Sequence, residues 1–279
     1  MSQVTEAVEP HDPVKSNFDF DNEFRLNTTD ETLLENVKVN IRRQLPQLLK
    51  NPQQSKPVAI VAGGWSLEET LDELVELWWN DTPIIALNGA GNYLIERNIR
   101  PAVVAVLDAR EMNVSFVEND IQRCKYLLAS QCHPSLFDKC EDREVYIYHV
   151  ESSDAVKEEL ESYYFKLHAF VPGGSTIGLR AISLAHLMGF RDMHFFGMDS
   201  CYQDERHHAY EQEWNNGETV APLICGGRRF MCSGWQMSQA KQFVRFVQSQ
   251  GQHFNLHMHG DGLLAHIIKT GANLLEGED

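Results

Sequence analysis

Residues 58–66 read VAIVAGGWS, and this stretch decides the expected fold. Residues 58–62 form a short apolar run rich in β-branched side chains, which is typical of a buried strand. The run ends at Gly63-Gly64, where the chain can turn tightly. Ser66 can cap a following helix, and Glu69, three residues later, completes a capping box. The stretch therefore predicts a strand, a glycine turn and a helix in succession.

The same succession of strand and helix continues along the chain. Apolar β-rich runs predict further strands, and apolar residues at helical spacing predict the helices between them. A sheet whose strands alternate with helices is mostly parallel and carries helices on both faces. The sequence therefore predicts an α/β, Rossmann-like fold. The expected strands are 58–62, 84–87, 103–107, 126–130, 145–148, 193–196 and 253–258, and the expected helices are 31–50, 154–165, 175–189, 235–250 and 262–275.

The length and the charge of the chain limit the classes of protein to which it can belong. The 279 residues carry a formal net charge of −16, which argues against a general binder of nucleic acid or of anionic membranes, because such proteins need a basic face. No apolar run reaches the roughly 20 residues of a membrane helix, and the acidic N-terminus lacks a secretion signal. The six cysteines form no CxxC pair, so we expect reduced thiols in a cytoplasmic protein.

The domain organisation is simple. Residues 1–30 are polar and acidic, and they are expected to be a disordered tail or an arm that docks on a partner. Residues 31–279 are expected to form one Rossmann-like domain, with an N-terminal helix over 31–50 that bends at Pro46. The polar, aromatic and Gly-rich stretch 200–233 has no clear period, so we expect a long loop or lid there.

Glycines and polar residues follow four of the expected strands: Gly63-Gly64 and Ser66, then Asn88, Asp108 and Asp199. Because ligands bind beyond the carboxyl ends of parallel strands, this pattern favours a nucleotide site. The glycines let a phosphate approach the backbone, and Asn88 can read a base or a hydroxyl. Asp108 and Asp199 can bind ribose hydroxyls or a Mg²⁺ ion. Each residue alone also fits a tight turn, a helix cap or a loop salt bridge.

A second glycine element, Gly173-Gly174-Ser175-Thr176, opens the helix expected over 175–189. A helix N-terminus with two glycines and two hydroxyls can bind an anion, and a second anion site suits a diphosphate. The alternative is an ordinary Ser N-cap after a loop.

The histidines and one arginine pair are further candidates. His207 and His208 lie in the expected lid and can serve as general acid or base, although a solvated loop is the plainer interpretation. The His257-Met-His259 stretch places two imidazoles on one face of a strand, but no third ligand is evident, so we do not predict structural zinc. Arg228-Arg229 can clamp a phosphate or lie on the surface.

These residues resemble a known family. The loop GGWSL at 63–67 looks like the "G-x-G-P-S-L" loop of the family that includes archaeal 6-hydroxymethylpterin diphosphokinase, the MptE-like proteins, and the motility-associated flagellin glycosyltransferases. The segment GGSTIGLRAISLAHLMGFRDMHFFGMD at 173–199 is similar to a long family pattern that ends in G-x-D. The helix at 36–40 and Gln239 also fit, so the resemblance covers about 33–270.

A more distant resemblance is to bacterial sialyltransferases that use a CMP-sugar. Two departures from these patterns stand out: Trp65 occupies the usual proline position, and residues 230–235 lack the histidine that the sialyltransferases carry there. The resemblance implies nucleotide contacts at Gly63, Gly64, Ser66, Asn88, Asp108, Ser175, Thr176 and Asp199.

The sequence and the resemblance together favour a nucleotide-dependent transferase, with glycosyl transfer from a nucleotide-sugar ahead of Mg²⁺-dependent diphosphoryl transfer to a small alcohol such as a pterin. The acceptor and the oligomeric state are not indicated. A nucleotide-binding module without catalysis is an interpretation of another class. The catalytic candidates are Asp108, Asp199, His207 and His208, of which Asp108 and Asp199 are also the metal-ligand candidates.

Overall fold

The computed structural model describes residues 28–164, 170–211 and 218–274 of the chain. Nearly all of the tail expected over 1–30 lies outside these residues. None of the helices in the described ranges has the length and apolar character needed to cross a bilayer.

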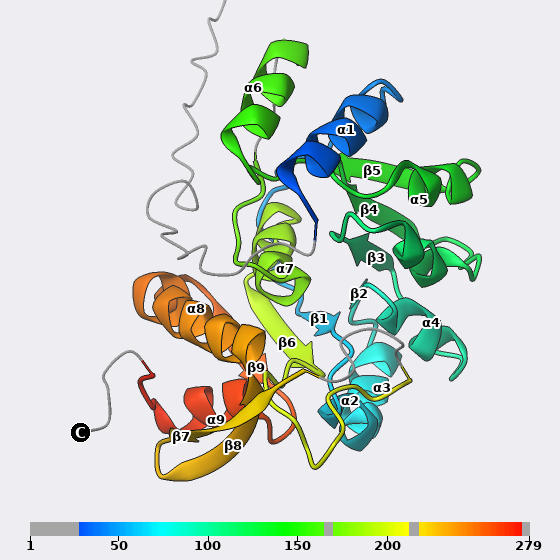
Figure 1. Cartoon of the computed structure of the whole chain (residues 1–279). Coiled ribbons are helices and arrows are strands. Elements are labelled where there is room, and N and C mark those ends of the chain that lie inside the picture. The colour runs from blue at the N-terminus through cyan, green and yellow to red at the C-terminus, as the bar shows by residue number, and fades with distance from the viewer. Residues whose placement is uncertain (1–27, 165–169, 212–217, 275–279) are drawn as a thin grey trace, which may run out of the picture.

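A seven-stranded sheet forms the centre of the molecule (Figure 1). Its strand order is β5-β4-β3-β2-β1-β6-β9, and every neighbouring pair is parallel. This confirms the expected α/β, Rossmann-like sheet. The strands are β1 (Val58–Val61), β2 (Ile84–Leu87), β3 (Val103–Val106), β4 (Lys125–Ala129), β5 (Glu144–Tyr148), β6 (Asp192–Phe196) and β9 (Asn255–Met258).

Helices cover both faces of this sheet. Figure 1 shows α7 and α8 on one side and α2 to α5 on the other. The helices are α1 (Asp30–Ile41), α2 (Ser66–Glu69), α3 (Leu71–Trp79), α4 (Ala90–Ile95), α5 (Pro134–Lys139), α6 (Asp154–Tyr163), α7 (Ile177–Leu187), α8 (Gly234–Gln250) and α9 (Leu263–Thr270), with 3₁₀ turns η1 (Glu111–Val117) and η2 (Gly251–His253).

The three central strands β1, β2 and β3 are buried along their whole length. A strand that is covered on both faces must be apolar at every position, which explains the continuous runs VAIV, IIAL and VVAV. Each buried Val, Ile or Leu side chain contributes about 1.5–3 kcal/mol relative to an exposed one. These strands therefore form the stable platform on which the loops at their ends are held.

The strand order reverses beside β1. The chain runs outward from β1 through β2, β3, β4 and β5, and then returns to place β6 on the other side of β1. At such a reversal the loops after the two neighbouring strands diverge to opposite faces, which opens a crevice at the carboxyl edge. The fold thus places the most favourable ligand position beyond the ends of β1 and β6.

The helix expected over 31–50 is shorter than predicted. α1 ends at Ile41, and Gln44 adopts a left-handed conformation with φ 54°. Pro46 therefore does not bend a helix, because the residue before a proline disfavours helical geometry and the chain has already turned. Instead, Ile147 N donates to Pro46 O (2.9 Å) and Leu48 N donates to Ile147 O (2.9 Å), so this segment extends the β5 edge.

The prediction of one long loop over 200–233 is also wrong in part. Residues 220–233 form an antiparallel hairpin of β7 (Val220–Cys225) and β8 (Arg228–Ser233). Gly226 and Gly227 both have positive φ and make its two-residue turn. The burial of β7 alternates between exposed and partly buried positions, a period of two that the polar composition of this stretch obscured. All six cysteines are free and buried, as expected for reduced thiols.

Two asparagines attach α1 to the sheet. Asn36 Nδ2 donates to the carbonyl oxygens of Ala109 and Gln131, and Asn40 Nδ2 donates to those of Ser130 and Cys132. Both side chains are buried. These bonds satisfy carbonyls just beyond the ends of β3 and β4, where the sheet itself supplies no partner.

The Asn40→Ala variant is expected to destabilise the fold by about 1–3 kcal/mol, because it leaves two buried carbonyl oxygens without a donor. Urea denaturation of the full chain measures the free energy of unfolding. Val39→Ala, at an exposed position of the same helix, is the matched control and should change stability little. Equal effects of the two substitutions would contradict the role given to Asn40.

Candidate active site

One pocket lies at the carboxyl edge of the sheet, at the strand-order reversal, and has a volume of about 450 Å³. Its walls come from the loops that follow β1, β2, β3 and β6 and from the N-terminus of α7. We call it the carboxyl-edge pocket; its lining includes residues 62–64, 87–88, 107–110, 175–178 and 197–200, together with Gln131, His207, His208, Tyr210, Glu218, Trp235, Gln236 and Gln239.

The pocket brings together most of the residues that the sequence singled out. Lining residues include Gly63, Gly64, Asn88, Asp108, Ser175, Thr176, Asp199, His207 and His208, whereas Ser66, Gly173 and Gly174 do not line the pocket. Arg228 and Arg229 do not line it, and Arg228 instead pairs with Asp261 (Nη1 to Oδ1, 2.7 Å).

Hydrogen bonds join the loop after β1 to the end of β6. Gly64 N donates to Gly197 O (2.7 Å), and Ser66 N donates to Asp199 Oδ2 (2.9 Å). The expected capping box is wrong, because Trp65 is the N-cap of α2 and its side chain makes no capping bond. The buried carboxylate of Asp199 takes the place of a local cap from 133 residues away in the sequence.

Packing within the protein explains both glycines of this loop. A Cβ at Gly64 would collide with Asp199 Oδ2 and Gly197 O, and a Cβ at Gly63 would collide with Tyr210 Oη. The loop backbone therefore runs directly against the end of β6. Because the N–H groups of Gly64 and Ser66 are already bonded, they are not free for a phosphate in this arrangement.

Residues 207–210, which we call the strap, cross this glycine loop. His208 forms an antiparallel bridge with Gly64, and Ala209 N donates to Gly63 O (3.0 Å). The ring of Tyr210 lies 5.5 Å from that of Tyr93, centroid to centroid. Part of the stretch expected to be a lid is thus held over the glycine loop, at the mouth of the pocket.

Burial controls the ionisation of Asp199. Its side chain is almost fully buried, which raises its pKa to about 6, while the hydrogen bond from Ser66 acts in the opposite direction. Near neutral pH the carboxylate is charged at a cost in stability. The hydrogen bond from the backbone N–H of Ser66 offsets part of that cost.

Asp108 is engaged by a neighbouring guanidinium. Arg110 Nε lies 3.0 and 3.1 Å from the two carboxylate oxygens of Asp108, and Nη2 lies 2.5 Å from Oδ2. The local salt bridge that the sequence left open as an alternative is therefore present. It does not remove Asp108 from the pocket, which both residues line.

The segment 173–176, which precedes α7, is held by hydrogen bonds to buried side chains. Arg180 donates to the carbonyl oxygens of Val171, Gly173 and Gly174, and its burial lowers the pKa of the guanidinium to about 10. Ser175 is not the helix cap, because its N–H and hydroxyl both donate to Gln242 Oε1. Thr176 is the N-cap and accepts from Leu179 N (3.3 Å).

The two strap histidines are neutral near physiological pH. Burial, helped by the adjacent His207, lowers the pKa of His208 to about 3. Burial also lowers the pKa of His207, against the opposing effect of the Glu218 carboxylate. Within the described ranges, four buried polar atoms of pocket residues have no hydrogen-bond partner: Asn88 Oδ1, Gln131 Oε1, His207 Nε2 and His208 Nδ1. Such atoms usually mark a place for water or a ligand.

Several lining residues were not predicted as site residues, although Gln239 was noted as part of the family resemblance. Gln131 follows β4 at the same edge, so the rule that selected Asn88 and Asp108 could have found it. Trp235 Nε1 donates to Glu218 Oε2 (2.5 Å), a pair formed only when the hairpin folds. Gln239 bonds both Thr176 Oγ1 (2.9 Å) and Ser200 Oγ (2.7 Å), and thereby ties α8 to α7 and β6.

The fold and the pocket together define a Rossmann-like protein with a pocket at the reversal of its strand order. Residues 31–205 match the family described as "6-hydroxymethylpterin diphosphokinase MptE-like". The chain belongs to this family, which confirms the resemblance read from its glycine loop and its G-x-D segment. No curated protein matches the sequence.

The fold is similar to that of a solved glycosyltransferase. The MAf glycosyltransferase from Magnetospirillum magneticum AMB-1 matches with a TM-score of 0.64 and 15% identity, over 85% of this chain and 39% of that one. The chain thus corresponds to about two fifths of that enzyme. A mammalian sialyltransferase matches with a TM-score of 0.42 and 9% identity, over 87% of this chain and 82% of that one.

The Asp199→Asn variant tests the ionisation of the buried carboxylate. A folded-state pKa raised from 3.8 to about 6 means that protonated Asp199 stabilises the fold below pH about 4, and that this contribution is lost as the pH rises to about 6. Relative to wild type, the variant should therefore gain about 3 kcal/mol of stability between pH about 4 and about 7. Urea denaturation at both pH values measures the difference.

Asp142→Asn, at an exposed position, is the control and should show no such change. A stability difference between Asp199→Asn and wild type that is the same at both pH values would contradict the raised pKa of Asp199.

Proposed function

We propose that this chain transfers a sugar from a nucleotide-sugar donor bound in the carboxyl-edge pocket to a hydroxyl acceptor. One observation carries the proposal: the pocket lies beyond the ends of β1 and β6, where the strand order reverses, and buried polar atoms of its walls lack partners among the described residues. This is the position at which open parallel sheets bind nucleotides.

The wall chemistry suits the parts of a nucleotide. The amide of Asn88 and that of Gln131 can exchange hydrogen bonds with a base or with ribose hydroxyls. Phe116, Tyr210 and Trp235 offer aromatic surface to a base or a sugar ring. The backbone N–H groups at the start of α7, which follow Thr176, provide a dipole-favoured position for a phosphate.

The charge of the pocket favours glycosyl over diphosphoryl transfer. Among the described lining residues, Arg110 is the only Lys or Arg, and it is already paired with Asp108. Asp199 and Glu218 add further carboxylates to the wall. Diphosphoryl transfer needs cations around the transferred group, whereas a nucleotide-sugar places less charge in the same space. The fold similarity to the MAf glycosyltransferase supports the same choice.

In the proposed step, one bond forms and one bond breaks. The acceptor oxygen attacks the anomeric carbon of the donor sugar, and the bond between that carbon and the phosphate oxygen breaks, so that the nucleotide leaves with the electron pair. The acceptor proton passes to an imidazole of the strap, for which His208 Nδ1 and His207 Nε2 are the candidates. An anionic nucleotide beside the strap raises the pKa of these imidazoles again, which strengthens them as bases.

Mg²⁺ binding by Asp108 and Asp199 stays a prediction that the arrangement does not favour. Both oxygens of Asp108 accept from Arg110, and Asp199 Oδ2 accepts from Ser66 N. Both carboxylates thus already serve contacts within the protein, Asp108 with a guanidinium and Asp199 with a backbone N–H. We therefore derive no step through Mg²⁺, and Asp199 is assigned to holding the glycine loop.

Binding is tested by thermal unfolding of the full chain with CMP, UMP, UDP, GDP, ADP and ATP and with the corresponding nucleotide-sugars, each with and without Mg²⁺. A ligand of the folded state raises the melting temperature. We expect a shift with one class of nucleotide-sugar and its nucleotide product. A shift confined to ATP with Mg²⁺ would favour diphosphoryl transfer instead, and no shift with any nucleotide would contradict the proposal.

The Asn88→Asp variant tests whether the nucleotide binds in the carboxyl-edge pocket. Asn88 has φ 50°, a conformation that Asp also tolerates, so the substitution keeps the backbone and adds a negative charge to the wall. Affinity for the stabilising nucleotide should fall at least about tenfold, or about 1.4 kcal/mol, by calorimetric titration. Asn51→Asp, at an exposed position outside the pocket lining, is the matched control. Equal affinities of the two variants would exclude Asn88 from the site.

His207→Gln and His208→Gln separate binding from chemistry. Removal of the general base should lower the turnover of the nucleotide-sugar by about 10²–10⁴-fold with little change in donor affinity. Donor consumption is followed by chromatography, and His253→Gln, an exposed histidine outside the pocket lining, should retain wild-type turnover. Undiminished turnover in both strap variants would exclude the strap as the source of the base.

A further inference from the structure

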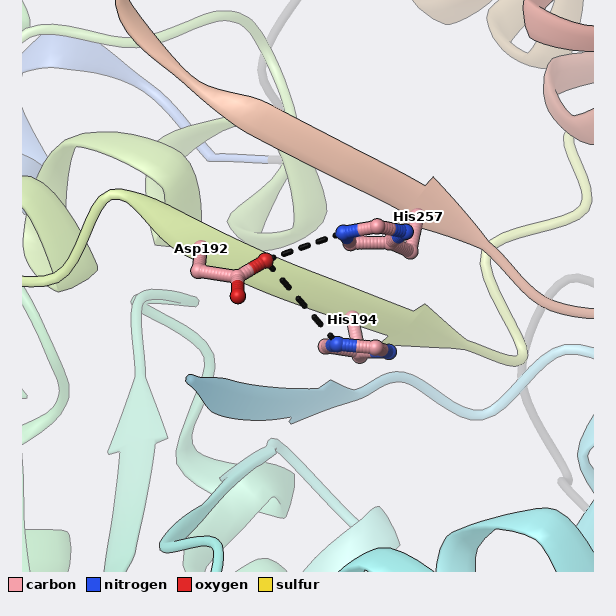
Figure 2. A group of neighbouring side chains, drawn as sticks. All are labelled: Asp192, His194 and His257. Atoms are coloured by element: carbon pink, nitrogen blue, oxygen red, sulfur yellow. Dashed lines mark hydrogen bonds and ion pairs between the residues drawn. The ribbon is translucent and has the colours of Figure 1, made fainter. Parts of the chain in front are cut away.

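A second group of side chains lies on β6 and β9, outside the carboxyl-edge pocket. Asp192 and His194 project from β6 and His257 from the neighbouring edge strand β9 (Figure 2). Asp192 Oδ1 lies 2.9 Å from His257 Nε2 and 3.9 Å from His194 Nε2. In the described part of the chain, this is the one group of three or more His, Cys, Asp or Glu whose ligand atoms all lie within 4.8 Å of one another.

A chain of hydrogen bonds orients His194. His259 Nδ1 lies 2.5 Å from Glu73 Oε2 on α3, and His259 Nε2 lies 3.0 Å from His194 Nδ1. A carboxylate can only accept, so His259 carries its proton on Nδ1, and in its neutral form it accepts at Nε2. His194 must then donate from Nδ1, which leaves a lone pair on Nε2.

That lone pair faces an anion. His194 Nε2 and Asp192 Oδ1 lie 3.9 Å apart, which is beyond hydrogen-bond distance. A cation between them would turn two opposed acceptors into two ligands. Metal-bound histidines are oriented in this way, by a hydrogen bond from the second ring nitrogen to a group behind it.

His257 can complete the group by a rotation of its ring. Its ring stacks on that of His194, with centroids 4.3 Å apart and planes 13° apart, so the two imidazoles lie side by side next to Asp192. The side chain of His257 is 49% exposed, and its Nε2 is hydrogen-bonded to Asp192 Oδ1 (2.9 Å). A small turn of this half-exposed ring, which releases its hydrogen bond to Asp192, would aim the nitrogen at an ion beside Asp192 and His194.

We propose that Asp192, His194 and His257 bind a divalent first-row transition metal ion of the Zn²⁺ class. Two imidazoles and one carboxylate are a donor set typical of Zn²⁺ and its neighbours, with water in the remaining position. The sequence indicated no third ligand beside His257 and His259, whereas the sheet places Asp192 and His194 of β6 next to His257. His259 is a positioning residue, since both of its nitrogens are engaged.

The position of the site suggests what the ion does. It would join the edge strand β9 to β6 and, through His259 and Glu73, to α3. The residues that follow β9 reach the glycine loop, because a Cβ at Gly260 would collide with Ser66 and one at Gly262 with Asp199. The bound ion would therefore stabilise β9 and the residues after it, which pack against the glycine loop. This role does not depend on the proposed function.

Metal titration of the untagged full chain tests the proposal after treatment with a chelator. Zn²⁺ should bind with a stoichiometry of one in calorimetry and raise the melting temperature. Co²⁺ should give the visible d–d absorption of a site with nitrogen and oxygen ligands, and Zn²⁺ should displace it. Absence of Zn²⁺ and Co²⁺ binding in the wild-type chain would overturn the proposal.

Matched variants assign the ligands. His194→Gln and His257→Gln should each abolish the Co²⁺ spectrum, whereas His253→Gln should leave it unchanged. Glu73→Ala should weaken Zn²⁺ binding about 10–100-fold through the loss of orientation, and Glu76→Ala, an exposed position of the same helix, should not. A spectrum retained in both His194→Gln and His257→Gln would place the ion elsewhere and overturn the assignment.

Discussion

The hydrogen bond from the backbone N–H of Ser66 to the buried carboxylate of Asp199 holds the site together. It joins the loop after β1 to the end of β6, the two strands between which the sheet reverses its order. Next to it, Gly64 N donates to Gly197 O, and the backbone of the two loops runs in direct contact. The strap, the pocket wall and the turn at Gly262 all pack on this junction, so their positions depend on it.

The parallel sheet could be predicted because its signal is local. Continuous apolar runs such as VAIV and VVAV are typical of strands covered on both faces, and the apolar spacing of longer helices such as α7 and α8 is visible in the sequence. The short helices α4 and α5 were not predicted. The hairpin β7–β8 and the early end of α1 were missed because tertiary contacts decide them. Leu48 bonds to β5, and a polar, partly exposed hairpin carries little periodicity. The order of the strands, and hence the reversal beside β1, is likewise a long-range property.

The candidate site was predictable as a set of strand ends but not as a set of interactions. The strand-end rule gathered Gly63, Asn88, Asp108 and Asp199 around one pocket. It could not predict that the Asp199 carboxylate accepts a hydrogen bond from the backbone N–H of Ser66, or that Arg110 forms an ion pair with Asp108. Local spacing suggested that Ser66 caps its own helix, whereas a carboxylate distant in sequence does so. The cluster of Asp192, His194 and His257 escaped for the same reason, since only the pairing of β6 with β9 brings it together.

The central claim is that a nucleotide binds over the junction between the ends of β1 and β6. Amide hydrogen exchange of the full chain, read by mass spectrometry with and without saturating CMP or UDP, tests it most directly, because bound ligand reduces opening where it binds. We expect slower exchange in peptides that span 62–66 and 197–210, and unchanged exchange in the hairpin turn at 226–227. Protection confined to other parts of the chain, or none with either nucleotide, would contradict the account.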